Sequence, residues 1–322
     1  MLVSVVMNCL NGEAFLKRSM DSVFLQTYDI FEVVFIDNGS SDMSGEIAKQ
    51  YGPKVSYYRN DKTTTLGEAR DKGIMLANGN LIAFIDVDDA WEPNKIEEQV
   101  RLMKDEVSFV FSNAFVRAED GANFNLFEYV QPTKHDISNS LLRTDFIATS
   151  SVLFRRDAYF NSGEKYNKEL TIECDRDFFL RIVSKCNVDY FEGPLITRYM
   201  HSSSTTQVRT KSAESSITEL KILQDTINIF CKKNAVFDVP SLEVFNSNIN
   251  ILKGRHYWSH GHIESAKKSF AISHTVIGKL LYVATYIYPF KCSLKFVILL
   301  RQRMKLLLCT IKSKKYDTYP YR

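Results

Sequence analysis

Short apolar runs alternate with segments of helical periodicity through the first ninety residues of the chain. Apolar runs between polar turns are typical of buried strands, and apolar residues three or four apart are typical of amphipathic helices. This alternation predicts βαβ units, and so an α/β fold with a mostly parallel central sheet flanked by helices. The expected strands are residues 2–7, 31–37, 55–60 and 81–86, and the expected helices are residues 12–26, 43–50 and 66–79.

Two glycines lie at the ends of expected elements. Gly39 follows the second expected strand, and Gly79 closes the third expected helix. At both positions we expect a backbone conformation with positive φ, which glycine adopts without a steric penalty.

Carboxylates collect where the expected strands end. Asp37 ends the second strand, and Asp86 ends the fourth and is followed by Asp88 and Asp89. In an open parallel sheet, ligands bind outside the carboxyl ends of the strands. Three acids in four positions repel one another unless a cation lies among them, and Mg²⁺ or Mn²⁺ takes oxygen ligands. The pattern predicts a divalent-cation site, and the alternative is a solvated loop in which Asp89 caps the next helix.

Composition and charge place the chain among soluble globular proteins. The 322 residues fit about two structural units, and 45% hydrophobic with 25% charged residues allows a sizeable core. The net charge of +3 is unevenly divided, because Lys279–Arg322 holds ten basic residues and one acid. This basic tail predicts an anionic partner. Its apolar content favours a membrane surface, and it lacks the alternation of aromatic and basic residues typical of RNA recognition, so we expect no nucleic acid partner.

The tail also has helical periodicity, with basic residues among apolar positions over residues 296–312. A basic amphipathic helix of this kind lies in the headgroup layer of a membrane, and the alternative is a core helix with a solvated basic face. The uncharged stretch at residues 280–290 has 11 residues, too few for the roughly 18–20 of a spanning helix. Six scattered cysteines and a strand-like start favour a cytoplasmic location, with the inner face of the plasma membrane as a peripheral alternative.

Two stretches of the sequence resemble glycosyltransferase family 2. The first is "SVVMNCLNGEAFLKRSMDSVFLQTYDIFEVVFIDNGSSD", in which N-G, S-V-x-x-Q-T and D-x-G-S-x-D follow in the order of the family. The second is "GEARDKGIMLANGNLIAFIDVDDAWEPNKIEEQ", which matches a segment ending in L-D-x-D-D. The resemblance covers residues 1–205 and implies a nucleotide-binding domain of the GT-A fold there, with a helical region at 206–322. It further implies transfer of a sugar, with inversion, from a nucleotide diphosphate donor to an acceptor hydroxyl.

The resemblance also implies roles for individual residues. A Mn²⁺ or Mg²⁺ ion is expected to bind Asp88, with Asp89 as an alternative ligand. His201, in "RYMHSSSTT", is expected either to ligate the metal or to contact the diphosphate, although a lone histidine is more often a surface residue. The donor nucleotide is expected to contact Asn8, Asp37, Asn38, Arg70 and Asp86. Asn38 replaces a frequent aspartate and Leu10 a frequent aromatic residue, which leaves the base open.

The acids of "TIECDRDFFLRIVSKC" are the candidates for a catalytic base. By position they fit the N-terminus of an amphipathic helix, where its dipole stabilises negative charge. The segment resembles the family motif E-D-x-D-x-x-L-R, in which the aspartate of the E-D pair is the base. This implies Asp175 as the base, in preference to Glu173, with Cys174 where a glutamate is usual.

Three points stay open at this stage. Because Cys174 stands where a glutamate is usual, a catalytically inactive protein that binds nucleotide sugars or polysaccharides is an alternative. The acceptor is expected to be a saccharide, with lipid-linked saccharides of bacterial polysaccharide or lipopolysaccharide synthesis as one class. Thr149 and Ser150 either contact sugar hydroxyls or simply begin a strand.

Overall fold

The computed structural model describes residues 1–104, 106–119, 121–204 and 213–287. The predicted amphipathic helix of the basic tail lies outside these residues. The chain forms two compact units, Met1–Phe245 and a second that begins at Asn246. The predicted domain boundary after residue 205 stays a prediction.

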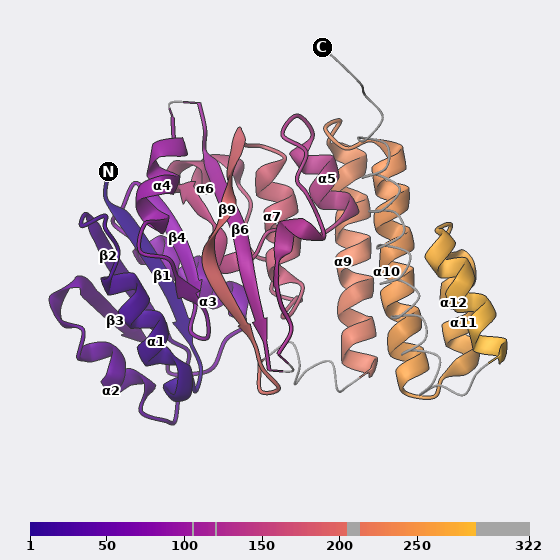
Figure 1. Ribbon diagram of the computed structural model, residues 1–322, viewed down its shortest axis with the longest axis horizontal. Helices are drawn as coiled ribbons and strands as arrows, with labels where there is room; N and C mark the ends of the chain where they lie inside the picture. Colours follow the sequence, from indigo (N-terminus) through magenta and orange to yellow (C-terminus); the bar gives the residue numbers. More distant parts are fainter. Residues whose placement is uncertain (105, 120, 205–212, 288–322) are drawn as a thin grey trace, which may run out of the picture. The chain divides into compact units, whose positions relative to one another are not determined.

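The strands of the described residues form one nine-stranded sheet in the order β3-β2-β1-β4-β8-β6-β9-β5, with β7 paired to β6 (Figure 1). The four strands that the sequence predicts are parallel to one another, whereas the others include antiparallel pairs, so the sheet is mixed. The bounds are β1 Val3–Cys9, β2 Phe31–Asp37, β3 Val55–Arg59, β4 Leu81–Asp86, β5 Ala90–Trp91, β6 Phe109–Ala118, β7 Asn123–Asn125, β8 Leu153–Arg155 and β9 Val188–Met200.

Helices α1 (Glu13–Phe24) and α3 (Leu66–Leu76) cover opposite faces of the parallel strands, with α1 in front in Figure 1. The apolar residues of α1 belong to the same core cluster as Val5, which lies on one face of β1. On the other face, α3 lies so close to β1 that a Cβ on Gly73 would be 2.3 Å from Val6. Full burial of each such aliphatic side chain contributes about 1.5–3 kcal/mol, which holds both helices on the sheet.

The remaining helices follow their local start signals. Thr65 and Glu68 form a capping box at the start of α3. The helix after the Asp86–Asp89 segment is α4 (Lys95–Leu102), which has Asn94 at its N-cap, so Asp89 does not cap it. The other helices are α2 Ser44–Lys49, α5 Ile137–Arg143, α6 Arg156–Ser162, α7 Cys174–Val183, α9 Ala213–Lys233, α10 Val239–Ser259, α11 Ile263–Ile272 and α12 Val276–Ile287, with 3₁₀ turns η1 Gly52–Lys54, η2 Leu126–Glu128 and η3 Thr149–Ser151.

Glycine is required at Gly39 and at Gly79 for different physical reasons. Gly39 has a φ of 89°, as predicted. Gly79 does not have positive φ, and that prediction was wrong. A Cβ at Gly79 would instead lie 2.7 Å from the Leu2 carbonyl oxygen and the Ser4 nitrogen, so the close approach to β1 requires glycine there.

The second unit has a small core of its own around Trp258, Phe270 and Leu281. Its helix α12 leaves four large apolar side chains exposed at helical spacing, namely Val276, Ile277, Leu280 and Val283. Among the described helices, none combines the length and the apolar character needed to cross a membrane.

Candidate functional site

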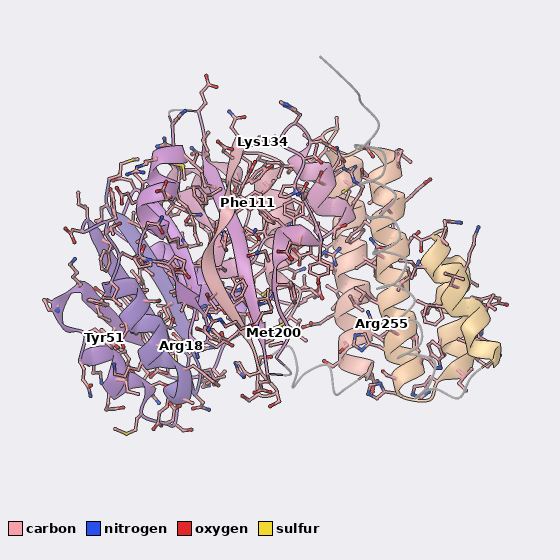
Figure 2. The ribbon with its side chains drawn as sticks, viewed as in Figure 1. Arg18, Tyr51, Phe111, Lys134, Met200 and Arg255 are labelled. Carbon is pink, nitrogen blue, oxygen red and sulfur yellow. The ribbon has the colours of Figure 1, made fainter. Side chains whose placement is uncertain are left out.

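A cavity of about 440 Å³ opens where the carboxyl ends of β1 and β4 meet. In Figure 1 these ends lie toward the lower edge of the sheet. Figure 2 labels Met200, which ends β9 at the same edge and lines the cavity. One wall comes from β1, the Asn38 turn, the start of α3 and the end of β4, and the other from η3, the turn before α7 and the end of β9.

Asp86, Asp88 and Asp89 form a carboxylate cluster on the first wall. Each offers an oxygen, and the three oxygens lie within 4.8 Å of one another. His201 is brought to this cluster, because its Nε2 lies 3.0 Å from Oδ2 of Asp88 and its Nδ1 lies 2.8 Å from the Ser203 hydroxyl. Closely spaced oxygen donors are the ligands that Mg²⁺ and Mn²⁺ take, so the residues present fit a divalent cation.

The three acids differ in exposure and in partners. Asp89 is buried, and its oxygens accept hydrogen bonds from the Ser150 hydroxyl at 2.5 Å and the Tyr199 amide at 3.3 Å. Burial, together with the charges of Asp86 and Asp88, raises the pKa of Asp89 to about 8. Burial and the Asp86 charge also raise the pKa of Asp88. Ionisation of all three acids is therefore unfavourable without a counter-charge, and a bound cation would stabilise their ionised forms.

Arg70 joins this cluster to the second wall. Its buried guanidinium donates through one nitrogen to Asp86 Oδ1 at 2.7 Å and through another to Asp175. Burial alone would lower the pKa of Arg70, but the charges of Asp175 and Asp86 raise it well above its ordinary value. The single guanidinium of Arg70 thus pairs with both Asp86 and Asp175.

Asp175 lies in the first turn of α7 and lines the cavity. Besides the pair with Arg70, it accepts a hydrogen bond of 2.9 Å from the Thr149 hydroxyl. Burial raises the pKa of Asp175 above its ordinary value, and the Arg70 charge offsets this only in part. The carboxylate is therefore a stronger base than an exposed aspartate, and two donors fix its orientation.

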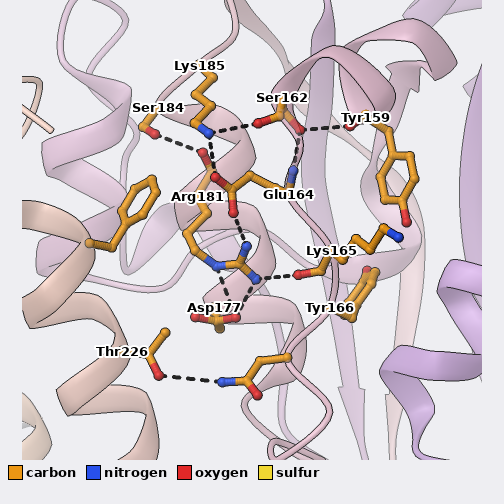
Figure 3. Close-up of polar contacts among 12 residues, drawn as sticks. Tyr159, Ser162, Glu164, Lys165, Tyr166, Asp177, Arg181, Ser184, Lys185 and Thr226 are labelled. Carbon is orange, nitrogen blue, oxygen red and sulfur yellow. Dashed lines mark hydrogen bonds and ion pairs between the residues drawn. The ribbon is translucent and has the colours of Figure 1, made fainter. Parts of the chain in front are cut away.

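The neighbouring acids of α7 are placed differently. Glu173 lines the cavity, but it lies 3.8 Å from Arg176 of the same segment. Asp177 does not line the cavity. Figure 3 shows Asp177 held by Arg181, whose Nη2 donates to it at 2.6 Å and to the Lys165 carbonyl at 2.7 Å. Asp177 and Arg181 thus tie α7 to the preceding segment, and Asp175 is the acid best placed to meet a ligand.

The predicted donor residues are brought together in part. Asn8, Asn38, Arg70 and Asp86 line the cavity, and no group among the described residues bonds to the buried Oδ1 of Asn8. Asp37 does not line it, because its fully buried carboxylate accepts from the Ser40 amide, the Tyr57 hydroxyl and Arg59. The predicted contact between Asp37 and a base stays a prediction, as do the ligand roles of Asp89 and His201.

Three charged residues that line the cavity were missed by the sequence analysis. Arg176 and Arg198 lie on the second wall, and both fall inside or beside segments already singled out by their acids or by His201. Arginines within segments that also hold candidate site residues are the signal that could have found them. Asp145 also lines the cavity, but it stands in a stretch with no motif.

Thr149 and Ser150 begin no strand. They belong to η3, where Thr149 holds Asp175 and Ser150 holds Asp89. Behind this turn, the side chains of Trp91 and Gln99 donate to the carbonyls of Ser150 and Ser151 at 2.9 and 2.6 Å. These bonds fix η3 on the sheet side, so both carboxylates are held by an anchored turn.

Known proteins resemble this chain in sequence and in fold. Residues 4–160 match the family described as Glycosyl transferase family 2. The chain carries a family 2 glycosyltransferase domain. A glycosyltransferase of Rickettsia typhi is 27% identical over 225 residues, which cover 66% of this chain and 68% of that protein. The UDP-Glc:alpha-D-GlcNAc-diphosphoundecaprenol beta-1,3-glucosyltransferase WfgD of Escherichia coli is 33% identical over 114 residues, 35% of this chain and 45% of that protein.

The fold of the glycosyltransferase agrees with these matches. The crystal structure of S. aureus TarS 1-349 in complex with UDP-GlcNAc has a TM-score of 0.66 at 13% identity, and the match covers 88% of this chain and 90% of that one. The predicted GT-A fold is thereby confirmed. Asp175 lies beyond the matched residues 4–160, so its assignment depends on the geometry of the cavity.

Proposed function

We propose that this glycosyltransferase is a metal-dependent, inverting enzyme that moves a sugar from a nucleotide diphosphate to a hydroxyl of a saccharide acceptor. The observation that carries the proposal is the placement of the carboxylate cluster and Asp175 on one cavity, joined by Arg70. A single in-line displacement needs neutralisation of charge at the leaving group and a base at the attacking hydroxyl. The two walls offer one group for each task.

The donor side is supported by two side chains that line the cavity. Asn8 is one of them, and no group among the described residues bonds to its buried Oδ1, so a donor group of the nucleotide would fill this need. Arg198 is exposed and lines the same cavity, where it would pair with the diphosphate.

The cation, Mn²⁺ or Mg²⁺, would be held by Asp86 and Asp88, with Asp89 and His201 as further candidates. When bound, it supplies positive charge for the departing diphosphate. The side chain of Asp86 is 40% exposed, so it is the most accessible acid of the cluster to an ion entering from the cavity.

Asp175 would take the proton of the acceptor hydroxyl. Arg70 and Thr149 hold its two oxygens in place, and its raised pKa favours proton acceptance. As this proton is removed, the hydroxyl oxygen would form its bond to the anomeric carbon on the face opposite the bond that breaks to the leaving nucleoside diphosphate, and this in-line attack would invert that carbon.

For the acceptor we favour a lipid-linked saccharide at the cytoplasmic face of a membrane. The name of the relative WfgD contains a diphosphoundecaprenol-linked acceptor. The exposed apolar residues of α12 and the ten basic residues from Lys279 onward support contact with an anionic lipid surface. Enzyme and acceptor would then share that surface.

The experiment is hydrolysis and transfer from UDP-glucose, UDP-GlcNAc and GDP-mannose, with Mn²⁺ or with EDTA. We expect turnover of at least one donor with Mn²⁺, loss with EDTA, and a loss of about 10²-fold in Asp88→Asn. NMR of the product is expected to show an inverted anomeric carbon. Calorimetric binding of a nucleotide sugar without any turnover would favour the inactive binding protein instead, and turnover unaffected by EDTA would contradict metal dependence.

A further inference from the structure

The turn that leads into Asp175 separates two cavities. Thr171, Ile172 and Glu173 line the cavity that holds the carboxylate cluster. Behind the turn lies a second cavity of about 440 Å³, lined by Thr171 again and by residues of α9 that include Glu219. Thr171 thus lines both cavities, and Glu219 of α9 lines the second one.

Glu219 makes those contacts. It is 8% exposed, and its Oε1 accepts from the Thr171 amide at 2.7 Å and from the Ile172 amide at 3.3 Å. Its Oε2 accepts from the Ile172 amide at 3.1 Å. A buried carboxylate that receives two backbone N–H groups makes charge-assisted bonds, roughly twice as strong as neutral ones.

These bonds hold the segment immediately before α7. Glu173, the N-cap residue of α7, makes no side-chain capping bond. The Glu219 carboxylate lies at the two amides just before this helix end, where the helix dipole favours negative charge. The Cys174 thiol, which donates to the Thr171 carbonyl at 3.3 Å, closes the same turn from within. The backbone just before Asp175 is thus held by the carboxylate of Glu219, which is 48 residues from Thr171 and 47 from Ile172 along the chain.

We propose that Glu219 is a positioning residue for the transfer reaction, which holds the Thr171–Ile172 turn and through it the Asp175 carboxylate. This inference rests on the proposed role of Asp175 as the base. Among the described residues, Glu219 accepts hydrogen bonds from Thr171 and Ile172, which lie just before Asp175, so it acts on the base side. Misplacement of a catalytic group by about 1 Å costs on the order of 10²-fold in rate.

Three variants test the proposal: Glu219→Ala, Glu219→Gln and the control Glu214→Ala. Glu214 is exposed on the same helix and lines the same second cavity, so its removal changes the charge of that cavity equally. We expect kcat for donor hydrolysis to fall about 10- to 100-fold in Glu219→Ala, with the donor KM within about twofold of wild type. Glu219→Gln keeps an oxygen for the Thr171 amide and is expected to stay within about threefold of wild type, as is Glu214→Ala.

Hydrogen exchange of the amides at residues 171 and 172 gives a readout independent of turnover. We expect at least about tenfold faster exchange in Glu219→Ala and no change in Glu214→Ala, because only the first variant removes their acceptor. Unchanged exchange, a kcat within twofold of wild type, or equal losses in the alanine and glutamine variants would overturn the proposal. If the wild-type protein turns over none of the three donors, the proposed function fails, whereas faster exchange in Glu219→Ala still supports the hold of Glu219 on the turn.

Discussion

Arg70 and Asp175, which are 105 residues apart in the sequence, form a partly buried ion pair in the wall of the cavity. The same guanidinium pairs with Asp86, so the position of the base candidate and that of the first cluster carboxylate are coupled. Loss of one partner of a buried pair leaves an uncompensated charge, which is costly.

Substitution of Arg70 tests this coupling through stability. We expect Arg70→Met to lower the free energy of unfolding by about 1.5–3 kcal/mol, since two partly exposed carboxylates lose a buried cation. Arg70→Lys keeps the charge and is expected to lose less. Urea denaturation measures both. Arg101→Met is the control, because Arg101 is 63% exposed and such surface pairs contribute about 0–1 kcal/mol. Equal losses in the Met variants of Arg70 and Arg101 would contradict the coupling.

Asp175→Asn tests the base. An amide cannot accept the proton, so we expect transfer to fall about 10²- to 10⁴-fold while donor binding by calorimetry persists. In the wild type, activity is expected to rise with pH through the raised pKa of Asp175, so the acid limb lies above the ~3.9 of an exposed aspartate. Glu173→Gln is the control and is expected to keep its activity within about threefold. If Glu173→Gln lost more activity than Asp175→Asn, Glu173 would be the base instead of Asp175.

Asp37 is expected to act on stability in a pH-dependent way. Burial alone would raise its pKa, but hydrogen bonds from Tyr57 and Ser40 and the Arg59 charge more than offset this and lower it. The stabilisation is therefore present above the unfolded pKa of ~3.9 and is lost as the pH falls through the lower folded value. We expect Asp37→Asn to cost about 1–3 kcal/mol at pH 7 and to approach wild type near pH 3.

Thermal unfolding at pH 7, 5 and 3 checks this expectation. The control is Asp21→Asn, which removes an exposed pair with Lys17 and should cost no more than about 1 kcal/mol. A difference between Asp37→Asn and wild type that stays constant from pH 7 to pH 3 would show that the ionised carboxylate contributes nothing specific.

Membrane contact is expected to depend on α12. Val276 and Val283 are 65% and 51% exposed, and insertion of each into lipid contributes about 1.5–3 kcal/mol. We expect Val276→Asp with Val283→Asp to weaken cosedimentation with vesicles of phosphatidylglycerol at least about tenfold. Ile229→Asp, an exposed change on α9, is the control. The proposed contact with a membrane would be contradicted if the wild-type protein did not bind these vesicles, or if all variants bound them equally.

Local signals explain why the donor-side wall was predictable. Asp86 ends β4 and pairs with Asn8, the last residue but one of the parallel strand β1, and parallel strands place their carboxyl ends at one edge. Partners brought together by the tertiary fold carry no such signal. The pairing of Arg70 with Asp175 and the reach of Glu219 to Thr171 depend on how α3 and α9 pack near α7, which neither periodicity nor a motif reports. The buried position of Asp89 likewise depends on a hydrogen bond from Ser150, which is 61 residues away.

The η3 turn places a constraint on how such an enzyme can change. Thr149 and Ser150 are adjacent, yet the Thr149 hydroxyl donates to Asp175 and the Ser150 hydroxyl donates to Asp89. An insertion or deletion there would displace both carboxylates at once. A change of acceptor preference, in nature or by engineering, is therefore more accessible through the segments that border the cavity elsewhere, such as the one around Asp145, than through this turn.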